Sequence, residues 1–193
     1  MSFETPAAPY NASDPYASFL NASCLDLLLI EIVPMAYRIA NELPLTPKDA
    51  DKSVDEEEQR EAAFRRLESL GYRVGQGLVE RFSRDRPRFA DTLDAIKFLC
   101  KDMWTLVFRK QIDNLKTNHR GVYVLTDNSF KPFSRMSMQS PVEAAAQAQP
   151  FLWFPCGVIR GTLASMGINA TVHADTLEVP GATFQVKIIS GKS

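Results

Sequence analysis

The spacing of apolar residues changes along the 193-residue chain, and this change constrains the fold more than any other feature of the sequence. Up to about residue 118, apolar side chains recur every three or four positions, which is the period of an amphipathic helix. Near the C-terminus, every second residue of the segment 183–188 (TFQVKI) is apolar, which is the period of a half-buried strand. Helices that precede paired strands predict an α+β fold with an antiparallel sheet.

Composition narrows the classes of function. The chain has 22 basic and 23 acidic residues, so its net charge of −1 provides no overall attraction to nucleic acid or to an anionic membrane. Its three cysteines, Cys24, Cys100 and Cys156, are far apart, and its two histidines do not suggest a clustered zinc site. We therefore expect reduced thiols, no metal, no other cofactor and no nucleic-acid partner.

The sequence predicts ordered and disordered segments. Residues 1–17 are rich in Pro, Ala, Ser and Asn and predict a disordered tail. Residues 18–193 are enough for a single domain with its own core. Within that domain, residues 42–58 (ELPLTPKDADKSVDEEE) combine two prolines with an acidic run and predict a flexible, solvated loop.

The first predicted helix, over residues 23–43 (SCLDLLLIEIVPMAYRIANEL), is apolar on almost every side. Ser23 and Asp26 are spaced as a capping pair at its start. A membrane span needs about 20 apolar residues, whereas Asp26, Glu31 and Arg38 interrupt this run. We expect a helix with one face in its own core and another against a second protein; the alternative is a fully internal helix.

Small residues one helical turn apart predict close helix packing. Gly71 and Gly75 lie in a second helix expected from about residue 61, and Gly157, Gly161 and Ser165 lie in another over 151–167. The run GQG at 75–77 lacks the preceding strand and the third glycine of a dinucleotide-binding loop, which argues against that interpretation.

The run CGVIRG at 156–161 places three residues between Cys156 and Arg160. A cysteine phosphatase loop has five there, so that both side chains converge on one phosphate, and this segment does not fit that chemistry. Arg160 instead lies one helical turn after Cys156 and needs an acceptor for its charge.

The segment 104–125 (WTLVFRKQIDNLKTNHRGVYVL) joins aromatic residues, cations and a glycine, and is therefore the first place to look for a reaction site. A helix predicted over 91–118 puts Trp104 and Phe108 in an apolar stripe that faces the core. Arg109 and Asp113 then form an i, i+4 pair on the solvent side.

The end of this predicted helix explains its cations without catalysis. Lys116, His119 and Arg120 fall in or just after the last turn, where the helix dipole favours positive charge. Gly121 stands where a left-handed cap is expected. Since no serine, cysteine or carboxylate is placed by sequence to partner His119, we predict a cap or a basic contact surface and no catalytic residue.

After residue 121 the pattern becomes that of strands. VYVL at 122–125 predicts a strand, Asp127 and Asn128 a tight turn, and FKPF at 130–133 a returning strand that Pro132 places at an edge. Two more strands are expected over 170–176 and 182–188, the first with His173 on its surface.

Four segments resemble the small subunits of the transport protein particle, TRAPP: LIEIVPMAYRI at 29–39, LGYRVGQGLVERF at 70–82, FLCKDMWTLVFRKQIDNLKTNHRGVYVLTDNSF at 98–130, and FPCGVIRGTLASMGINATVHAD at 154–175, with FQVKI at 184–188. The resemblance spans roughly residues 18–189 and points to the thirty-three-kilodalton type of subunit, component six in animals. It implies an α/β plait, in which helices pack on one face of a twisted antiparallel sheet.

The resemblance also implies a non-catalytic core subunit of an assembly that tethers vesicles and acts as nucleotide exchange factor for a Rab-type GTPase in ER–Golgi traffic. Family members pair through their first helices, and this type pairs with the family's acyl-binding paralogue. Its expected partners are that paralogue, other TRAPP subunits and, through the assembly, the GTPase, in the cytoplasm with peripheral contact to Golgi and ER-derived membranes. The implied interface comprises Leu25, Leu28, Leu29, Ile32, Met35, Leu70, Val74 and Leu78.

The chain departs from the family in one place, and two other functions stay open. The acyl-binding paralogue has a cysteine before its long helix, where SRDRPRF at 83–89 has Arg86, so the resemblance does not extend to acylation. A ligand-binding module of the four-vinyl-reductase type shares the plait and needs a cavity between sheet and helices. An enzyme needs a reactive Cys156 or His119.

Overall fold

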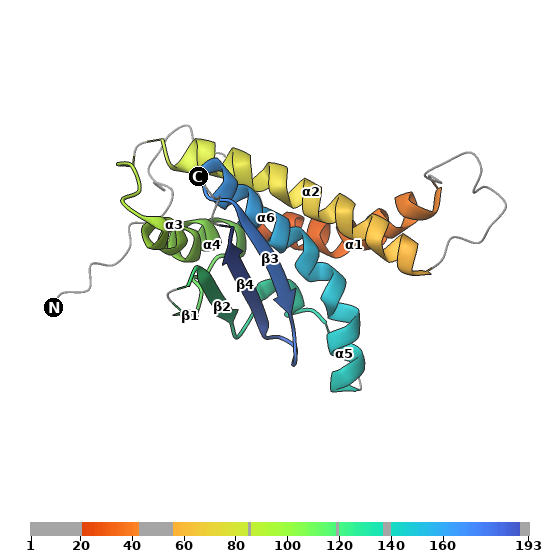
Figure 1. Ribbon diagram of the computed structural model, residues 1–193. Helices are drawn as coiled ribbons and strands as arrows, with labels where there is room; N and C mark the ends of the chain where they lie inside the picture. Colours follow the sequence, from red (N-terminus) through yellow and green to blue (C-terminus); the bar gives the residue numbers. More distant parts are fainter. Residues whose placement is uncertain (1–20, 43–55, 85, 119, 137–139, 190–193) are drawn as a thin grey trace.

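The computed structural model describes residues 21–42, 56–84, 86–118, 120–136 and 140–189. In chain order the elements are α1 (Ala22–Glu42), α2 (Glu56–Phe82), α3 (Thr92–Phe98), the π-helical η1 (Leu99–Met103), α4 (Trp104–Phe108), β1 (Asn114–Thr117), β2 (Val122–Asp127), the 3-10 turn η2 (Lys131–Phe133), α5 (Pro141–Ala148), the 3-10 turn η3 (Gln149–Leu152), α6 (Trp153–Ser165), β3 (Ala170–Asp175) and β4 (Ala182–Ile188). The strands form an antiparallel sheet in the order β1-β2-β4-β3, with helices gathered on one face (Figure 1). The predicted α+β plait is confirmed.

Alternation along the strands separates the two faces of the sheet. Leu125 of β2 lies opposite Phe184 of β4, and both are fully buried on the face toward the helices. His173 of β3 lies opposite Gln185 on the other face, where both side chains are exposed. The prediction of a surface strand histidine is therefore confirmed.

Aromatic rings fill the space between the sheet and the helices. The ring centroid of Trp104 lies 4.4 Å from that of Phe108 and 5.2 Å from that of Phe184. Phe130 and Phe133 join this cluster, with their centroids 5.1 Å apart. Because each aromatic side chain buries about 150–250 Å², this cluster is the centre of the main core, and the two predicted anchors, Trp104 and Phe108, belong to it.

α2 and α6 pack with their backbones nearly in contact, as the small residues predict. A Cβ added to Gly71 would lie 2.1 Å from the carbonyl oxygen of Phe154, and one added to Gly161 would lie 2.0 Å from that of Tyr72. The other glycine of each predicted strip meets backbone just as closely. Ser165, the third residue predicted for the α6 strip, is exposed beyond this contact, so its inclusion was wrong.

A second, smaller core lies between α1, α2 and the start of α6. Ile32 and Val33 from α1 meet Leu67 from α2 and Trp153 from α6. The edge of Phe64 packs against the Trp153 ring at a centroid distance of 5.7 Å. This core is the reason that α1 lies along α2 in Figure 1.

The helix predicted over residues 91–118 ends at Phe108. Arg109 adopts a left-handed conformation with φ of 64°, which stops the helix without a glycine. Residues 114–117 then form β1, where Leu115 pairs with Leu125. The extension to residue 118 was wrong because the spacing of Ile112 and Leu115 fits a helical period, whereas the chain finds its hydrogen-bond partners in β2.

The cations after this helix are consequently not a helix cap. Lys116 lies on β1, and Gly121, with φ of 79°, lies in the hairpin turn between β1 and β2. The Asn118 side chain organises this turn, because its Oδ1 accepts hydrogen bonds from the backbone N–H groups of Arg120 and Val122. His119 lies outside the described residues.

Two further expectations in the second half are corrected. FKPF is no edge strand; it forms η2, which turns the chain so that Phe130 and Phe133 both enter the core. The neighbours of β2 are β1 and β4 instead. α5 was not predicted, although Ser140 followed by Pro141 is a common helix start.

The ends of the predicted acidic loop are helical. Glu42 is the last residue of α1, and Glu56 begins α2, while residues 43–55 and the predicted tail 1–17 lie outside the described ranges. At the start of α1, the Asn21 side chain accepts a hydrogen bond from the Ser23 N–H, and Asp26 faces Arg135 at 3.7 Å. The cap is thus Asn21 rather than the predicted pair of Ser23 and Asp26.

Candidate partner interface

α1 is buried along one side and open along the other. Ile32, at 6% exposure, lies in the second core, whereas Leu27 and Leu28 remain 65% and 58% exposed. The alternative of a fully internal helix is therefore wrong for the isolated chain. The large apolar side chains exposed on α1 are Leu27, Leu28, Ile30 and Met35.

The eight residues predicted for the interface fall into three groups. Leu28 and Met35 of α1 and Val74 of α2 are exposed. Those that are half-buried are Leu25, Leu29, Leu70 and Leu78. Ile32 packs inside this chain, so substituting it would disturb folding and would not report on pairing alone.

The open side of α1 continues into a groove of about 600 Å³ between α1 and α2. Its apolar lining includes Met35 and Ile39 from α1 and Leu70 from α2. Three arginines of α2 also line it: Arg65, Arg66 and Arg73. The sequence pattern predicted that the leucines of this face belong to the interface. It gave no such prediction for the arginines, because arginines on the polar side of an amphipathic helix are usually solvated.

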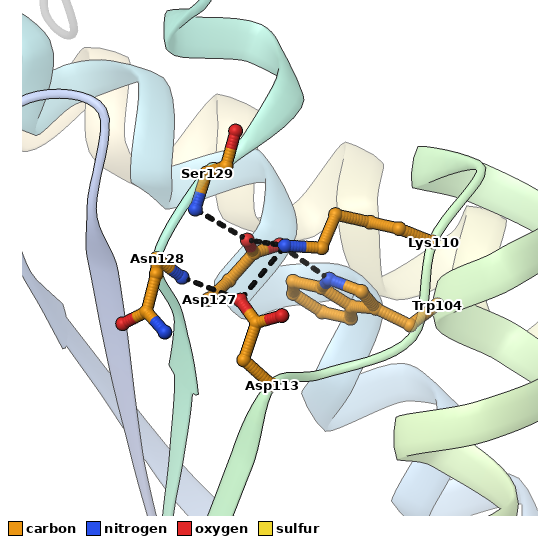
Figure 2. Close-up of polar contacts among 6 residues, drawn as sticks. All are labelled: Trp104, Lys110, Asp113, Asp127, Asn128 and Ser129. Atoms are coloured by element: carbon orange, nitrogen blue, oxygen red, sulfur yellow. Dashed lines mark hydrogen bonds and ion pairs between the residues drawn. The ribbon is translucent and has the colours of Figure 1, made fainter.

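The segment from Trp104 onward contains a polar cluster at the end of β2, in which the side chains bind one another (Figure 2). Asp127, fully buried at the end of β2, accepts hydrogen bonds from Trp104 Nε1 at 2.9 Å and from Lys110 Nζ at 2.6 Å. The backbone N–H of Ser129 donates to the same carboxylate at 3.0 Å. Each buried polar group here has a partner within the chain, so the cluster holds the left-handed turn at Arg109 against β2 and offers no open site.

Asp113 completes this cluster from the loop before β1. Its carboxylate accepts hydrogen bonds from Lys110 Nζ at 2.8 Å and from the backbone N–H of Asn128 at 2.7 Å, replacing the predicted Arg109–Asp113 pair. The hydrogen bond from Lys110 holds the pKa of Asp113 below its ordinary value. A carboxyl with a lowered folded-state pKa stabilises the fold above its ordinary pKa, and this contribution is lost as the pH falls through the folded-state pKa.

The candidate nucleophile is inaccessible. Cys156 is buried in α6, and burial raises the pKa of its thiol to about 12. Burial raises the pKa of Cys100 to about 12 as well. Such thiols stay protonated at neutral pH, which removes the chemical basis for a nucleophile.

Arg160 finds the acceptor that its place in an apolar helix requires. Two of its nitrogens donate to the Glu68 carboxylate of α2, and its guanidinium lies 4.4 Å from the Tyr72 ring centroid. The hydrogen bonds to Glu68 raise the pKa of Arg160 above its ordinary value. This pair joins α2 to α6 beside their glycine contact.

A small pocket between α1, α4 and η2 reaches toward Phe108 in the core. Its volume is about 30 Å³, which holds a water or two, whereas ligand sites are typically about 300–1,000 Å³. It does not support the ligand-binding alternative. Across the described ranges, no helix combines the length and the apolar character needed to cross a bilayer.

Proteins of similar sequence are subunits of a trafficking complex. Trafficking protein particle complex subunit 6b of Danio rerio is 50% identical over 123 residues, which are 64% of this chain and 77% of the relative. Subunit 6B of Homo sapiens is 51% identical over the same shares, and subunit 6A of Homo sapiens is 48% identical over 63% of this chain and 76% of its own.

A solved structure shares the fold. The trafficking protein particle complex subunit 3 from Naegleria fowleri, covalently bound to palmitic acid, superposes with a TM-score of 0.62 at 15% identity, covering 88% of this chain and 98% of that one. Residues 25–189 match the family described as transport protein particle (TRAPP) component. The chain thus belongs to the TRAPP component family of trafficking-complex subunits.

Proposed function

We propose that this chain is a non-catalytic core subunit of a TRAPP vesicle-tethering complex and that it pairs with the family's acyl-binding paralogue through α1 and α2. In this proposal the pair helps to build the assembly that acts as exchange factor for a Rab-type GTPase. The assembly works in the cytoplasm, in peripheral contact with Golgi and ER-derived membranes.

The observation that carries the proposal is the row of exposed apolar side chains on α1. Leu27 and Leu28 keep more than half of their surface in solvent although the opposite side of the same helix is buried. Several large apolar side chains exposed on one helix are typical of a protein contact. Met35 on α1 and Val74 on α2 are exposed as well.

Three other findings support the choice of partner and the non-catalytic role. The Naegleria fowleri trafficking-complex subunit with the same fold is covalently bound to palmitic acid, which supports an acyl-carrying subunit as the partner. In this chain, Arg86 stands in the segment where the acyl-binding paralogue has its cysteine. Its guanidinium donates to Asp102 at 2.5 Å and lies 4.8 Å from the Phe98 ring centroid, so this segment supports a partner role without an acyl group of its own. The buried thiol of Cys156 offers no nucleophile.

The variant Leu28→Glu tests the pairing. A carboxylate placed in an apolar contact costs several kcal/mol, so we expect at least about a hundredfold loss of affinity. Because Leu28 is exposed in the isolated chain, the free energy of unfolding of the variant should differ from that of the wild type by less than about 0.5 kcal/mol. Size-exclusion chromatography of the co-expressed paralogue and variant measures the first effect, and circular dichroism the second.

The matched control is Val142→Glu. Val142 of α5 is also an exposed apolar residue but lies away from α1 and α2 (Figure 1), so this variant should form the heterodimer normally. An intact heterodimer with Leu28→Glu would exclude α1 as the contact. In a reconstituted assembly, exchange on the GTPase should fall with Leu28→Glu only as far as the assembly fails to form.

A further inference from the structure

The groove between α1 and α2 carries cations around an apolar floor, and from it we infer the chemistry of what it binds. The geometry points to an acidic amphipathic helix of the partner subunit, with apolar side chains that enter the groove and carboxylates that face its arginines. This inference rests on the proposed function, because it concerns the same side of α1 and α2.

The floor of the groove is apolar and has room for several side chains of a docked helix. Met35 and Ile39 from α1 face Leu70 from α2 across a space of about 600 Å³. A groove between two helices is a common docking site for a third helix, whose apolar residues at intervals of three and four fill it. The exposed residues Leu28 and Val74 extend the apolar surface beyond the groove.

The charges that line the groove have one sign. Among the described residues that form its walls there are three arginines and no carboxylate. Arg73 is exposed and forms no hydrogen bond or ion pair with any residue in the part of the chain that the structure describes. A guanidinium in this position is able to bind a carboxylate through two parallel hydrogen bonds.

The other two arginines are weakly engaged. Arg66 donates to the carbonyl oxygen of Ala62 at 3.4 Å, and Arg65 lies 3.5 Å from Glu61 with both side chains more than half exposed. An exposed pair of this kind contributes little to stability, so its cation remains available to a stronger acceptor. The groove therefore offers uncompensated positive charge beside apolar surface.

This charge distribution argues against a second copy of the chain as the occupant. A two-fold contact places each surface patch against its own counterpart. Centred on the groove, such a contact would bring the arginines of two copies together, and like charges across an interface are unfavourable. An amphipathic partner helix with carboxylates covers the apolar surface and also neutralises the arginines.

Calorimetric titration of the full-length chain with the recombinant acyl-binding TRAPP subunit tests the inference. Arg73→Glu should raise Kd at least about tenfold at low ionic strength. The wild-type pair should weaken between about 50 and 300 mM NaCl, and the variant should lose most of this salt dependence. Arg73→Lys should restore part of the affinity, because it keeps the charge but not the planar fork.

Arg84→Glu is the matched control, since it makes the same charge change at an exposed arginine just after α2 and outside the groove. It should leave Kd unchanged. If the wild-type chain does not bind the paralogue, both the proposed function and this inference fail. If the wild type binds, and Leu28→Glu abolishes binding while Arg73→Glu and salt have no effect, the inference alone is overturned.

A second copy as occupant has its own signature. Analytical ultracentrifugation of the isolated chain would then show a dimer, and Arg73→Glu would strengthen it by removing like charges from the contact. That result would also overturn the inference. A monomeric wild-type chain, together with the affinity loss described for Arg73→Glu, supports an acidic partner.

Discussion

The two sides of α2 differ in whether this chain completes their contacts. Toward α6, a glycine strip brings the backbones together, and Arg160 meets Glu68. Toward α1, a groove remains open, with apolar residues and arginines that the described residues do not cover. The same helix therefore carries one contact that serves folding and one surface that is suited to assembly.

Two cations of the chain, Lys110 and Arg73, differ in the same way. Lys110 lies within 2.8 Å of two carboxylates, Asp113 and Asp127. Arg73 has no such partner in the described ranges. A paired cation is satisfied within the chain's own fold, whereas the exposed charge of Arg73 beside apolar side chains remains available to another molecule.

Among contacts completed within the chain, the largest effect is expected for Asp127→Ala in the polar cluster of Figure 2. This change removes the acceptor of the buried Trp104 indole and of Lys110, and breaking a buried pair costs about 3–5 kcal/mol. Lys110 is partly exposed and can be hydrated, so we expect about 3 kcal/mol, measured by urea unfolding. Asp113→Ala, which removes the more exposed carboxylate, should cost only about 1 kcal/mol. Equal losses would contradict the central role of Asp127.

Gly161→Ala tests the backbone contact of α2 and α6. Its Cβ would lie 2.0 Å from the Tyr72 carbonyl oxygen, so the two helices must separate. Overpacking costs about 1–3 kcal/mol, and we expect a loss of about 2 kcal/mol in the free energy of unfolding.

Gly77→Ala is the matched control for this substitution. Gly77 lies on the same long helix with no atom within 4 Å of an added Cβ. It should stabilise the chain by about 0.5–1 kcal/mol, because alanine is the better helix former. Destabilisation by both variants would mean that glycine matters here for another reason than the close approach.

Thr162→Val should have a modest effect of the opposite sign to Gly161→Ala. The Thr162 hydroxyl of α6 is buried and has no hydrogen-bond partner among the described residues. Valine has nearly the same shape without the unsatisfied group, so stability should rise by about 1 kcal/mol. A loss of stability would show that the hydroxyl does have a partner in solution.

Local pattern was sufficient for the elements that depend on their own residues. The apolar run located α1, the helical spacing of apolar residues located α2, and strict alternation located β4. Glycines one turn apart predicted the contact of α2 with α6, since only a missing side chain permits such an approach. The open face of α1 followed from a helix with too many apolar sides for one core.

Local pattern failed where a distant residue decides. The spacing of Ile112 and Leu115 agrees with a helix, yet Arg109 leaves the helical conformation and β1 pairs with β2. The acceptor that holds Lys110 in place is Asp127, seventeen residues later. Neither charge pairing nor strand pairing at that distance has a signature in local spacing.

The sequence by itself determined the α+β class, the order of the main helices and strands and the family, because periodicity and motif are properties of the chain. Only the tertiary structure decided which apolar and charged side chains remain without partners. It placed Ile32 inside, left Leu28 in solvent and gathered three arginines around one groove. Burial and charge compensation depend on what lies opposite each side chain in space, and this is set by packing rather than by neighbours in sequence.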